Sequence, residues 1–273
     1  NVLHNPSEEL PRVADALASF TRNGHMAGPL FNLPRSQFKT NPLMAVTKPG
    51  GHVRVVSNLK SPPGQSFNEG INSERLKDWP VTQLTAAQFG KKIFAAGQHA
   101  YMACSDLKDA YKMLPVEECQ RKLQAYFFCG ALFIELKLVF GDRMACQYFD
   151  RFHHAILHAF VYPESSFPPI AQGKTVDDIP SVVPQDAKHA LDSFVKAYRS
   201  SLTLLNIQAA EDDPSRTKAF DCAQEGEVLG IRFDTSTFTW ALPKDKLYYL
   251  VTGLRRLGDI RTRHSLRELE SVT

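Results

Sequence analysis

Three aspartates stand out as side chains that can do chemistry together. Asp106 follows residues 100–104, an apolar run with the composition of a buried strand, and the pair Asp177-Asp178 lies between short β-branched segments. If these segments lie side by side, the carboxylates converge and repel one another unless a cation lies between them. Hard oxygen ligands favour Mg²⁺ or Mn²⁺, and two such ions about 4 Å apart serve phosphoryl transfer. The three acids are therefore candidate catalytic residues and metal ligands.

The same acids have simpler interpretations. A pair of aspartates in a turn is often exposed to solvent without any catalytic role. Pro180 favours that interpretation because proline removes a backbone donor from a strand. A second metal site is also conceivable on a helix, where Asp150, His154 and His158 are spaced one turn apart. The sequence lacks a fourth ligand and the HExxH order there, so a helix that packs or lines nucleic acid is favoured over zinc.

Length and composition restrict the class of protein. The 273 residues are 43% hydrophobic, which predicts one large domain or two small ones. A formal net charge of +3 is too small to indicate a nucleic-acid partner by itself. The five cysteines show no CxxC spacing, which favours free thiols in a reducing compartment. No apolar run reaches the ~18 residues of a membrane helix, and no signal peptide opens the chain, so no membrane partner is expected.

Hydrophobic periodicity and turn residues predict both helices and hairpins. Helices are expected from Ser7 to Asn23-Gly24, near 80–90 beginning at Pro80, at about 143–159, at 186–205, from Pro243 onward, and from a capping box at 265–268. Hairpins are expected for 43–48 with 52–57, 123–128 with 132–138, and 227–233 with 237–242, and 60–70 is expected to be a loop. The order is not an alternation of strand and helix, so the predicted fold class is α+β.

The segments between the acids carry a resemblance to a known family. Residues 106–112, followed by Pro115-Val116, resemble the first catalytic motif of reverse transcriptases. Residues 138–141, Ala145 and residues 147–149 resemble their second motif, 176–178 their catalytic hairpin, and 228–231 with Phe233-Asp234 their primer-grip hairpin.

The N-terminal part resembles the same family. Pro42-Leu43, residues 48–51 and Arg54 are similar to the fingers hairpin. Within the family, the chain is most similar to the DIRS-type tyrosine-recombinase retrotransposons, on Asn58-Leu59, Pro62, Gly64, Ser66, Asn68, Ile71, Leu242-Pro243, Lys246-Leu247 and residues 266–269. The resemblance spans roughly residues 40 to 272, and five motifs in the right order make it fairly specific.

This resemblance implies a right-hand polymerase with an antiparallel palm sheet backed by helices. The implied domains are an N-terminal helix with part of the fingers (1–99), a palm with a fingers insertion near 112–140 (100–242), and the start of thumb or connection helices (243–273). The implied function is an RNA-directed DNA polymerase that transfers dNTPs to a primer 3′-hydroxyl. Its partners would be an RNA or DNA template, a DNA or RNA primer, and a protein partner or further C-terminal domains, inside the nucleus or cytoplasm.

The resemblance also assigns roles to individual residues. Asp106 and Asp177 would share two Mg²⁺ (or Mn²⁺) ions, with Asp178 as a helper acid. Tyr111 would pack under the sugar and exclude a ribose 2′-hydroxyl. The other implied substrate-binding residues are Lys48 and Arg54 for the triphosphate, Phe140, Gly141 and Gln147, and the implied primer-grip residues are Leu229 and Gly230.

Some positions depart from the family pattern. Thr175, Val139, Cys146 and Pro180 replace the usual residues, and Lys218 is the nearest candidate for a lysine expected after the 186–205 helix. These departures motivate an alternative function, a catalytically inactive reverse-transcriptase-like domain that acts as a nucleic-acid or protein-binding scaffold. A metal-dependent nuclease is a third interpretation, which leaves Tyr111 and the fingers hairpin unexplained.

Overall fold

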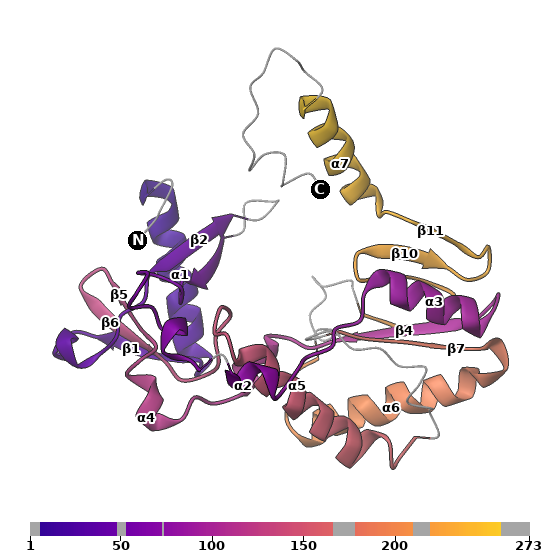
Figure 1. Cartoon of the computed structure of the whole chain (residues 1–273), viewed down its shortest axis with the longest axis horizontal. Helices are drawn as coiled ribbons and strands as arrows, with labels where there is room; N and C mark the ends of the chain where they lie inside the picture. The colour runs from indigo at the N-terminus through magenta and orange to yellow at the C-terminus, as the bar shows by residue number, and fades with distance from the viewer. Residues whose placement is uncertain (1–5, 48–52, 73, 166–177, 210–218, 258–273) are drawn as a thin grey trace. The chain divides into compact units, whose positions relative to one another are not determined.

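The computed structural model describes residues 6–47, 53–72, 74–165, 178–209 and 219–257 (Figure 1). The chain divides into two compact units, one formed by residues 1–82 and 109–156 and the other by residues 83–108 and 157–273. The chain therefore passes from the first unit to the second and back before it completes the second. These compact units are not the same as the predicted fingers, palm and thumb segments, whose boundaries after residues 99 and 242 stay a prediction.

The first unit is built on a helix and two antiparallel sheets. Its longer elements are α1 (Pro6–Arg22), the hairpin of β2 (Leu43–Thr47) and β3 (Val53–Ser57), and the sheet β1-β6-β5 (Met26–Leu30, Ala131–Glu135, Ala125–Phe128). The apolar face of α1 buries Val13 and Leu17 against Tyr126, Phe128 and Phe133. The remaining elements of the unit are η1 (Arg35–Gln37), η2 (Asn68–Gly70), α2 (Glu74–Lys77), η3 (Ala110–Met113), α4 (Glu118–Arg121) and α5 (Ala145–Ile156).

The second unit contains a three-stranded antiparallel sheet between two helices. The sheet order is β7-β4-β8 (Asp178–Val183, Tyr101–Asp106, Phe220–Ala223), and α3 (Ala86–Ala96) and α6 (Lys188–Leu204) cover opposite faces of it (Figure 1). Alternate residues of β4 point to opposite faces, so Met102 and Cys104 pack with Phe89 and Ile93 of α3. The remaining elements are η4 (Leu157–Val161), η6 (Gln185–Ala187), β9 (Glu225–Val228), β10 (Ile231–Asp234), β11 (Thr239–Ala241) and α7 (Lys244–Leu257).

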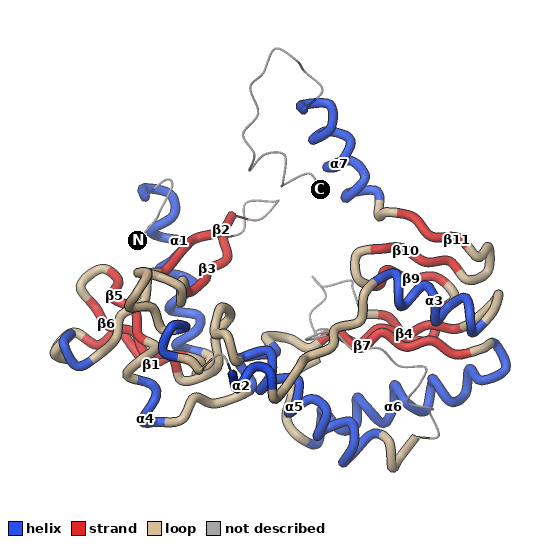
Figure 2. Tube along the Cα trace, in the orientation of Figure 1, coloured by secondary structure: helices blue, strands red, loops and turns tan. Residues whose placement is uncertain are grey.

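The structure confirms the α+β class. Figure 2 shows, within each unit, helices packed beside small sheets whose named strands all pair antiparallel. Among the described helices, none combines the length and the hydropathy that crossing a membrane requires. The capping box predicted at 265–268 lies outside the described residues.

The predicted start of the helix at Pro80 is wrong. The helix begins at Ala86, because Thr85 and Gln88 form a capping box: Thr85 Oγ1 accepts from the Gln88 N–H at 3.2 Å and Gln88 Oε1 accepts from the Thr85 N–H at 2.8 Å. Such a reciprocal cap satisfies two backbone donors that otherwise lack a partner, which outweighs the preference of proline for a first turn.

Replacement of Thr85 by alanine is expected to lower the free energy of unfolding by about 1 kcal/mol, because the cap acceptor is lost. Denaturant titration with circular dichroism measures this change. Thr85→Ser keeps the hydroxyl and should stay close to the parent protein, so equal losses in the two variants would contradict the role of the cap.

Two further expectations about strands need correction. The predicted single strand at 227–233 is two strands, β9 and β10, joined by a turn in which Leu229 and Gly230 both have positive φ (52° and 80°), as a two-residue hairpin requires. Pro180, expected to interrupt a strand, is buried inside β7 as the cross-strand partner of Cys104. In the order β7-β4-β8 of the described strands, β7 is an edge strand, where proline is tolerated because a residue there can face solvent with the side that would carry its N–H.

Candidate active site

Two of the three predicted acids are cross-strand partners in the second unit. Asp106 is the last residue of β4, Asp178 is the first of β7, and the antiparallel register places them opposite each other. Side chains at such positions lie on the same face of a sheet, with Cβ atoms about 4.5–5.5 Å apart. Asp106 is only 6% exposed and Asp178 is partly buried. Asp177 lies outside the described residues, but it is the covalent neighbour of Asp178.

The chain that follows Asp106 is held in place by backbone contacts. Leu107 is 1% exposed and pairs with Ala209 in an isolated antiparallel bridge, and the Lys108 N–H donates to the Gln208 carbonyl at 3.2 Å. The segment after α6 therefore anchors the end of β4, which fixes the backbone that carries Asp106.

The donor set at this strand end fits a divalent cation. Two paired carboxylates offer hard oxygen ligands, which Mg²⁺ and Mn²⁺ prefer, and a cation between them relieves their mutual repulsion. In the described part of the chain, no three His, Cys, Asp or Glu side chains gather closely enough to hold a metal ion. Because Asp177 is not among those residues, the complete set of three acids stays a prediction.

In the first unit, Tyr111 is the centre of a row of rings. Its side chain is 7% exposed and meets Phe140 (centroids 4.6 Å apart) and Phe149 (5.7 Å) edge to face. The guanidinium of Arg54, on β3, lies 4.5 Å from the centroid of the partly exposed Phe140 ring. The structure thus brings three predicted substrate-binding residues together, whereas Lys48 lies outside the described residues.

Gly141 follows Phe140 in a turn that requires glycine. Its φ of +98° is rarely adopted by other residues, and a Cβ there would come within 3.0 Å of the Ser57 carbonyl oxygen. The group that requires glycine here is the end of β3, and a role of Gly141 in substrate binding stays a prediction.

Gln147, on α5, carries a buried acceptor. Its Oε1 has no hydrogen-bond partner among the described residues, although the residue as a whole is partly exposed. A buried amide oxygen without a partner is uncommon and costly, and a role of Gln147 in substrate binding stays a prediction.

A buried polar network in the first unit was not predicted from the sequence. Lys112 Nζ lies 2.7 Å from Glu135 Oε2, Tyr126 OH donates to Glu135 Oε1 at 3.2 Å, and Ser57 Oγ is 2.5 Å from Tyr126 OH. Burial raises the pKa of Glu135, against the effect of Lys112, and also raises the pKa of Tyr126 well above its ordinary value. The network joins η3, which carries Tyr111, to β3, which carries Arg54.

The predicted primer-grip residues form the tip of the β9–β10 hairpin. Behind this tip, Lys246 of α7 forms an ion pair with Glu227 of β9 at 2.7 Å. The ammonium group lies directly over Gly230, where a Cβ would come within 2.7 Å of Lys246 Nζ. Lys246 therefore links α7 to the hairpin through Glu227 and fills the space beside Gly230 at the hairpin tip.

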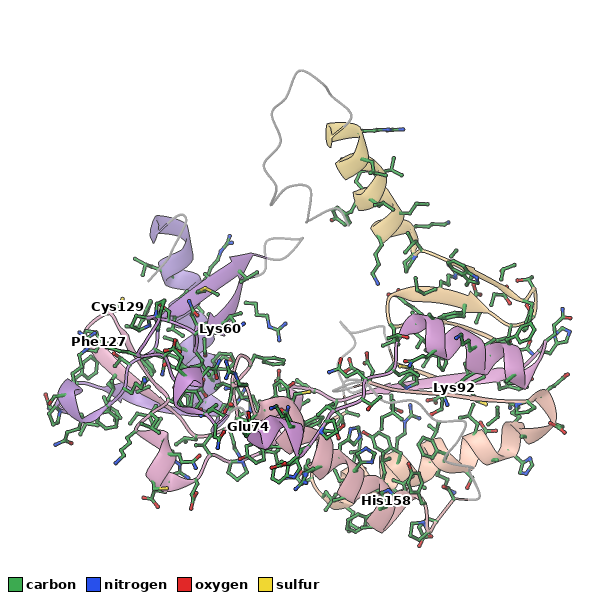
Figure 3. All side chains as sticks on the ribbon, in the orientation of Figure 1. Lys60, Glu74, Lys92, Phe127, Cys129 and His158 are labelled. Atoms are coloured by element: carbon green, nitrogen blue, oxygen red, sulfur yellow. The ribbon has the colours of Figure 1, made fainter. Side chains whose placement is uncertain are left out.

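The alternative zinc site on the histidine helix gains no support from the described residues. His154 lies 3.8 Å from Asp150, at the distance of a helical ion pair. His158, which is labelled in Figure 3, packs edge to face on Tyr162 with centroids 4.9 Å apart. Each side chain thus has a local partner, which agrees with the interpretation of a packing helix.

Comparisons with known proteins identify the fold. No protein-family model matches the sequence, and no curated protein matches it. Solved structures do match. The foamy viral protease-reverse transcriptase bound to double-stranded DNA aligns with a TM-score of 0.65 at 15% identity, over 96% of this chain and 38% of the other. The same viral protein bound to an RNA/DNA hybrid aligns with a TM-score of 0.64 at 15% identity, over 99% and 31%.

A third match is the prototype foamy virus protease-reverse transcriptase, with a TM-score of 0.60 at 17% identity over 95% of this chain and 32% of the other. This chain therefore spans about a third of the length of these proteins. At such low identity the likeness concerns the fold alone: the mixed helices and antiparallel sheets resemble those of reverse transcriptases.

Proposed function

We propose that this chain is the fingers and palm of an RNA-directed DNA polymerase. The observation that carries the proposal is the pairing of Asp106 with Asp178 at one end of β4 and β7, in a chain whose fold resembles reverse transcriptases. In this proposal the β7-β4-β8 sheet belongs to the palm, and the β2–β3 hairpin with the β1-β6-β5 sheet belongs to the fingers. The proposed relationship to DIRS-type retrotransposons rests on the sequence motifs.

The proposed reaction is attack of a primer 3′-hydroxyl on the α-phosphate of a dNTP, with pyrophosphate as the leaving group. Asp106, Asp177 and Asp178 would hold two Mg²⁺ (or Mn²⁺) ions, which supply activation of the hydroxyl and charge neutralisation when bound. The protein's own contribution is largely positioning of the two reactants. The template strand and primer would be held mainly through their phosphates, so binding should weaken as salt rises.

The first unit supplies the groups that would bind the nucleotide. Arg54 presents a planar fork of donors suited to phosphate, and its stacking on Phe140 holds that fork in one orientation. Lys48 would add a second positive charge. Tyr111 would close the space beside C2′ of the sugar, and the Gln147 amide would supply hydrogen bonds to the nucleotide.

Primer extension tests the function directly. The protein is incubated with an RNA template, an annealed DNA primer, dNTPs and Mg²⁺, and again after chelation of the metal. Metal-dependent extension supports the polymerase. Binding of the template–primer without any extension, in Mg²⁺ or Mn²⁺, would instead favour the catalytically inactive scaffold.

Tyr111→Val is expected to raise the use of NTPs relative to dNTPs on the order of 10–100-fold, because a smaller side chain admits the 2′-hydroxyl. The measurement is kcat/KM for a matched dNTP and NTP pair. Tyr111→Phe keeps the ring that packs on Phe140 and Phe149 and should retain the preference. Unchanged selectivity in Tyr111→Val would remove the proposed role of this ring.

A further inference from the structure

The loop at 58–70 is an ordered part of the first unit rather than a simple connection. The Asn68 N–H donates to the Leu59 carbonyl at 3.0 Å, which closes the loop. The Glu69 carboxylate accepts from the N–H groups of Gly64 (2.9 Å) and Ser66 (2.8 Å), and these bonds lower the pKa of Glu69. Leu59 and Ser66 are buried. The backbone of the loop is thus determined by its own hydrogen bonds.

One side chain of this loop reaches the Gly141 turn. Asn68 is 2% exposed; its Nδ2 donates to the Gly141 carbonyl at 2.7 Å, and its Oδ1 accepts from the Arg143 N–H at 3.0 Å. The amide therefore binds both ends of the turn with both of its polar atoms. If the amide were turned over, its Nδ2 would face the Arg143 N–H and its Oδ1 would face the Gly141 carbonyl. Only the observed orientation of the Asn68 side chain therefore satisfies both contacts.

The turn is held from a second side as well. The space beside the Gly141 Cα is closed by the Ser57 carbonyl oxygen at the end of β3. Asp142 Oδ1 accepts from the Met144 N–H at 2.8 Å, just before α5 begins. The turn therefore lies between β3, the 58–70 loop and the start of α5, and Asn68 is the side chain that binds across it.

Phe140 depends on this turn for its position. The ring is 38% exposed; it meets the Tyr111 ring edge to face with centroids 4.6 Å apart, and the Arg54 guanidinium lies 4.5 Å from its centroid. A shift of the Gly141 backbone moves the Phe140 ring with it, because the two residues share a peptide bond. The position of the ring pair that would surround the sugar is thus tied to the Asn68 side chain.

We propose that Asn68 is a positioning residue that determines the nucleotide affinity and sugar selectivity of this site. The proposal rests on the proposed polymerase function. In this proposal Asn68 does not contact the substrate; it holds the turn that fixes Phe140 beside Tyr111. Loss of the amide should therefore weaken binding and discrimination of nucleotides more than it slows the chemical step.

The test uses Asn68→Ala and the near-isosteric Asn68→Asp, with Glu69→Ala as a matched control. Asn68→Asp retains the acceptor for Arg143 but loses the donor to Gly141. Glu69→Ala removes hydrogen bonds of the same loop but leaves the bridge to the turn intact. For both Asn68 variants we expect KM for dNTPs to rise on the order of 10-fold, as the loss of a buried hydrogen bond predicts, with a smaller change in kcat and a reduced dNTP/NTP preference.

Amide hydrogen exchange adds a readout that does not depend on activity. In Asn68→Ala the Arg143 amide should exchange faster, whereas Glu69→Ala should affect Gly64 and Ser66 and leave Arg143 protected. If the parent enzyme extends primers and the Asn68 variants keep its KM and its dNTP/NTP ratio, the positioning role is wrong. If the parent protein fails to extend primers, the proposed function fails first, and the exchange of Arg143 still decides whether Asn68 holds the turn.

Discussion

Asp106→Asn is expected to lower the rate of primer extension by about three orders of magnitude while the protein stays folded. Asparagine has nearly the same shape but lacks the charge, so the site would lose an anionic ligand for a divalent cation. Loss of metal-assisted stabilisation of the transition state costs several kcal/mol, and each 1.36 kcal/mol is about a factor of ten in rate. Single-turnover incorporation of one dNTP measures the effect.

Asp109→Asn is the matched control for this prediction. It is the same chemical change three residues later, at a residue with a φ of 51° that asparagine tolerates well. Asp109→Asn should extend primers at nearly the parental rate. Thermal unfolding should show that Asp106→Asn is at least as stable as the parent, because a carboxylate opposite Asp178 has been neutralised. Near-parental extension by Asp106→Asn would exclude Asp106 as a metal ligand.

Lys112→Met is expected to destabilise the protein by about 3–5 kcal/mol, as the removal of one partner from a buried ion pair does. The side chains of Lys112 and Glu135 are only 9% and 3% exposed, and their atoms lie 2.7 Å apart. Methionine replaces the aliphatic part of the lysine, so the main loss is the charge that compensates Glu135. Denaturant titration at neutral pH measures the loss.

The matched control here is the double variant Lys112→Met/Glu135→Gln, which removes both charges and should recover part of the lost stability. If the double variant loses as much stability as Lys112→Met and Glu135→Gln lose together, the pair contributes no coupling energy.

The stability deficit of Lys112→Met should depend on pH. Burial raises the pKa of Glu135 in the folded state, and Lys112 opposes this effect by charge and hydrogen bonding. Without Lys112 the folded-state pKa rises further, so the folded protein binds a proton that the unfolded chain has already released. Stability then falls as pH rises from the unfolded pKa through the folded pKa. The loss of unfolding free energy in Lys112→Met should therefore be small at acidic pH and should reach its full size above the folded-state pKa of Glu135. A loss that does not change with pH would contradict the assignment of the effect to Glu135.

The sequence predicted those elements whose signals are local. The amphipathic pattern of Val13 and Leu17 predicted α1, and the alternation and turn residues predicted the β2–β3 and β5–β6 hairpins. The convergence of the strand that ends in Asp106 with the segment at Asp177-Asp178 is predicted from the apolar and β-branched residues beside these acids, whereas the register that places Asp106 opposite Asp178 is not. The start of α3 predicted at Pro80 is wrong because the capping box of Thr85 and Gln88 is the stronger start signal, although both signals are in the sequence.

Other features depend on contacts between distant residues and were not predictable in this way. Lys112 and Glu135 are 23 positions apart, and nothing in either local sequence indicates that both are buried or that they pair. Asn68 and Gly141 are 73 positions apart, and a loop rich in turn formers gave no sign that one of its amides would bind another turn. The tolerance of Pro180 required knowledge of the strand order.

The ion pair between Lys246 and Glu227 makes the direction of α7 sensitive to ionic strength. Both side chains are more than a third exposed, and ion pairs of that kind contribute little and are screened by salt. The helix itself exposes Leu247, Tyr248, Tyr249 and Leu254. The hairpin strands, joined by backbone hydrogen bonds, should keep their geometry in concentrated salt, whereas the angle at which α7 leaves them should become more variable.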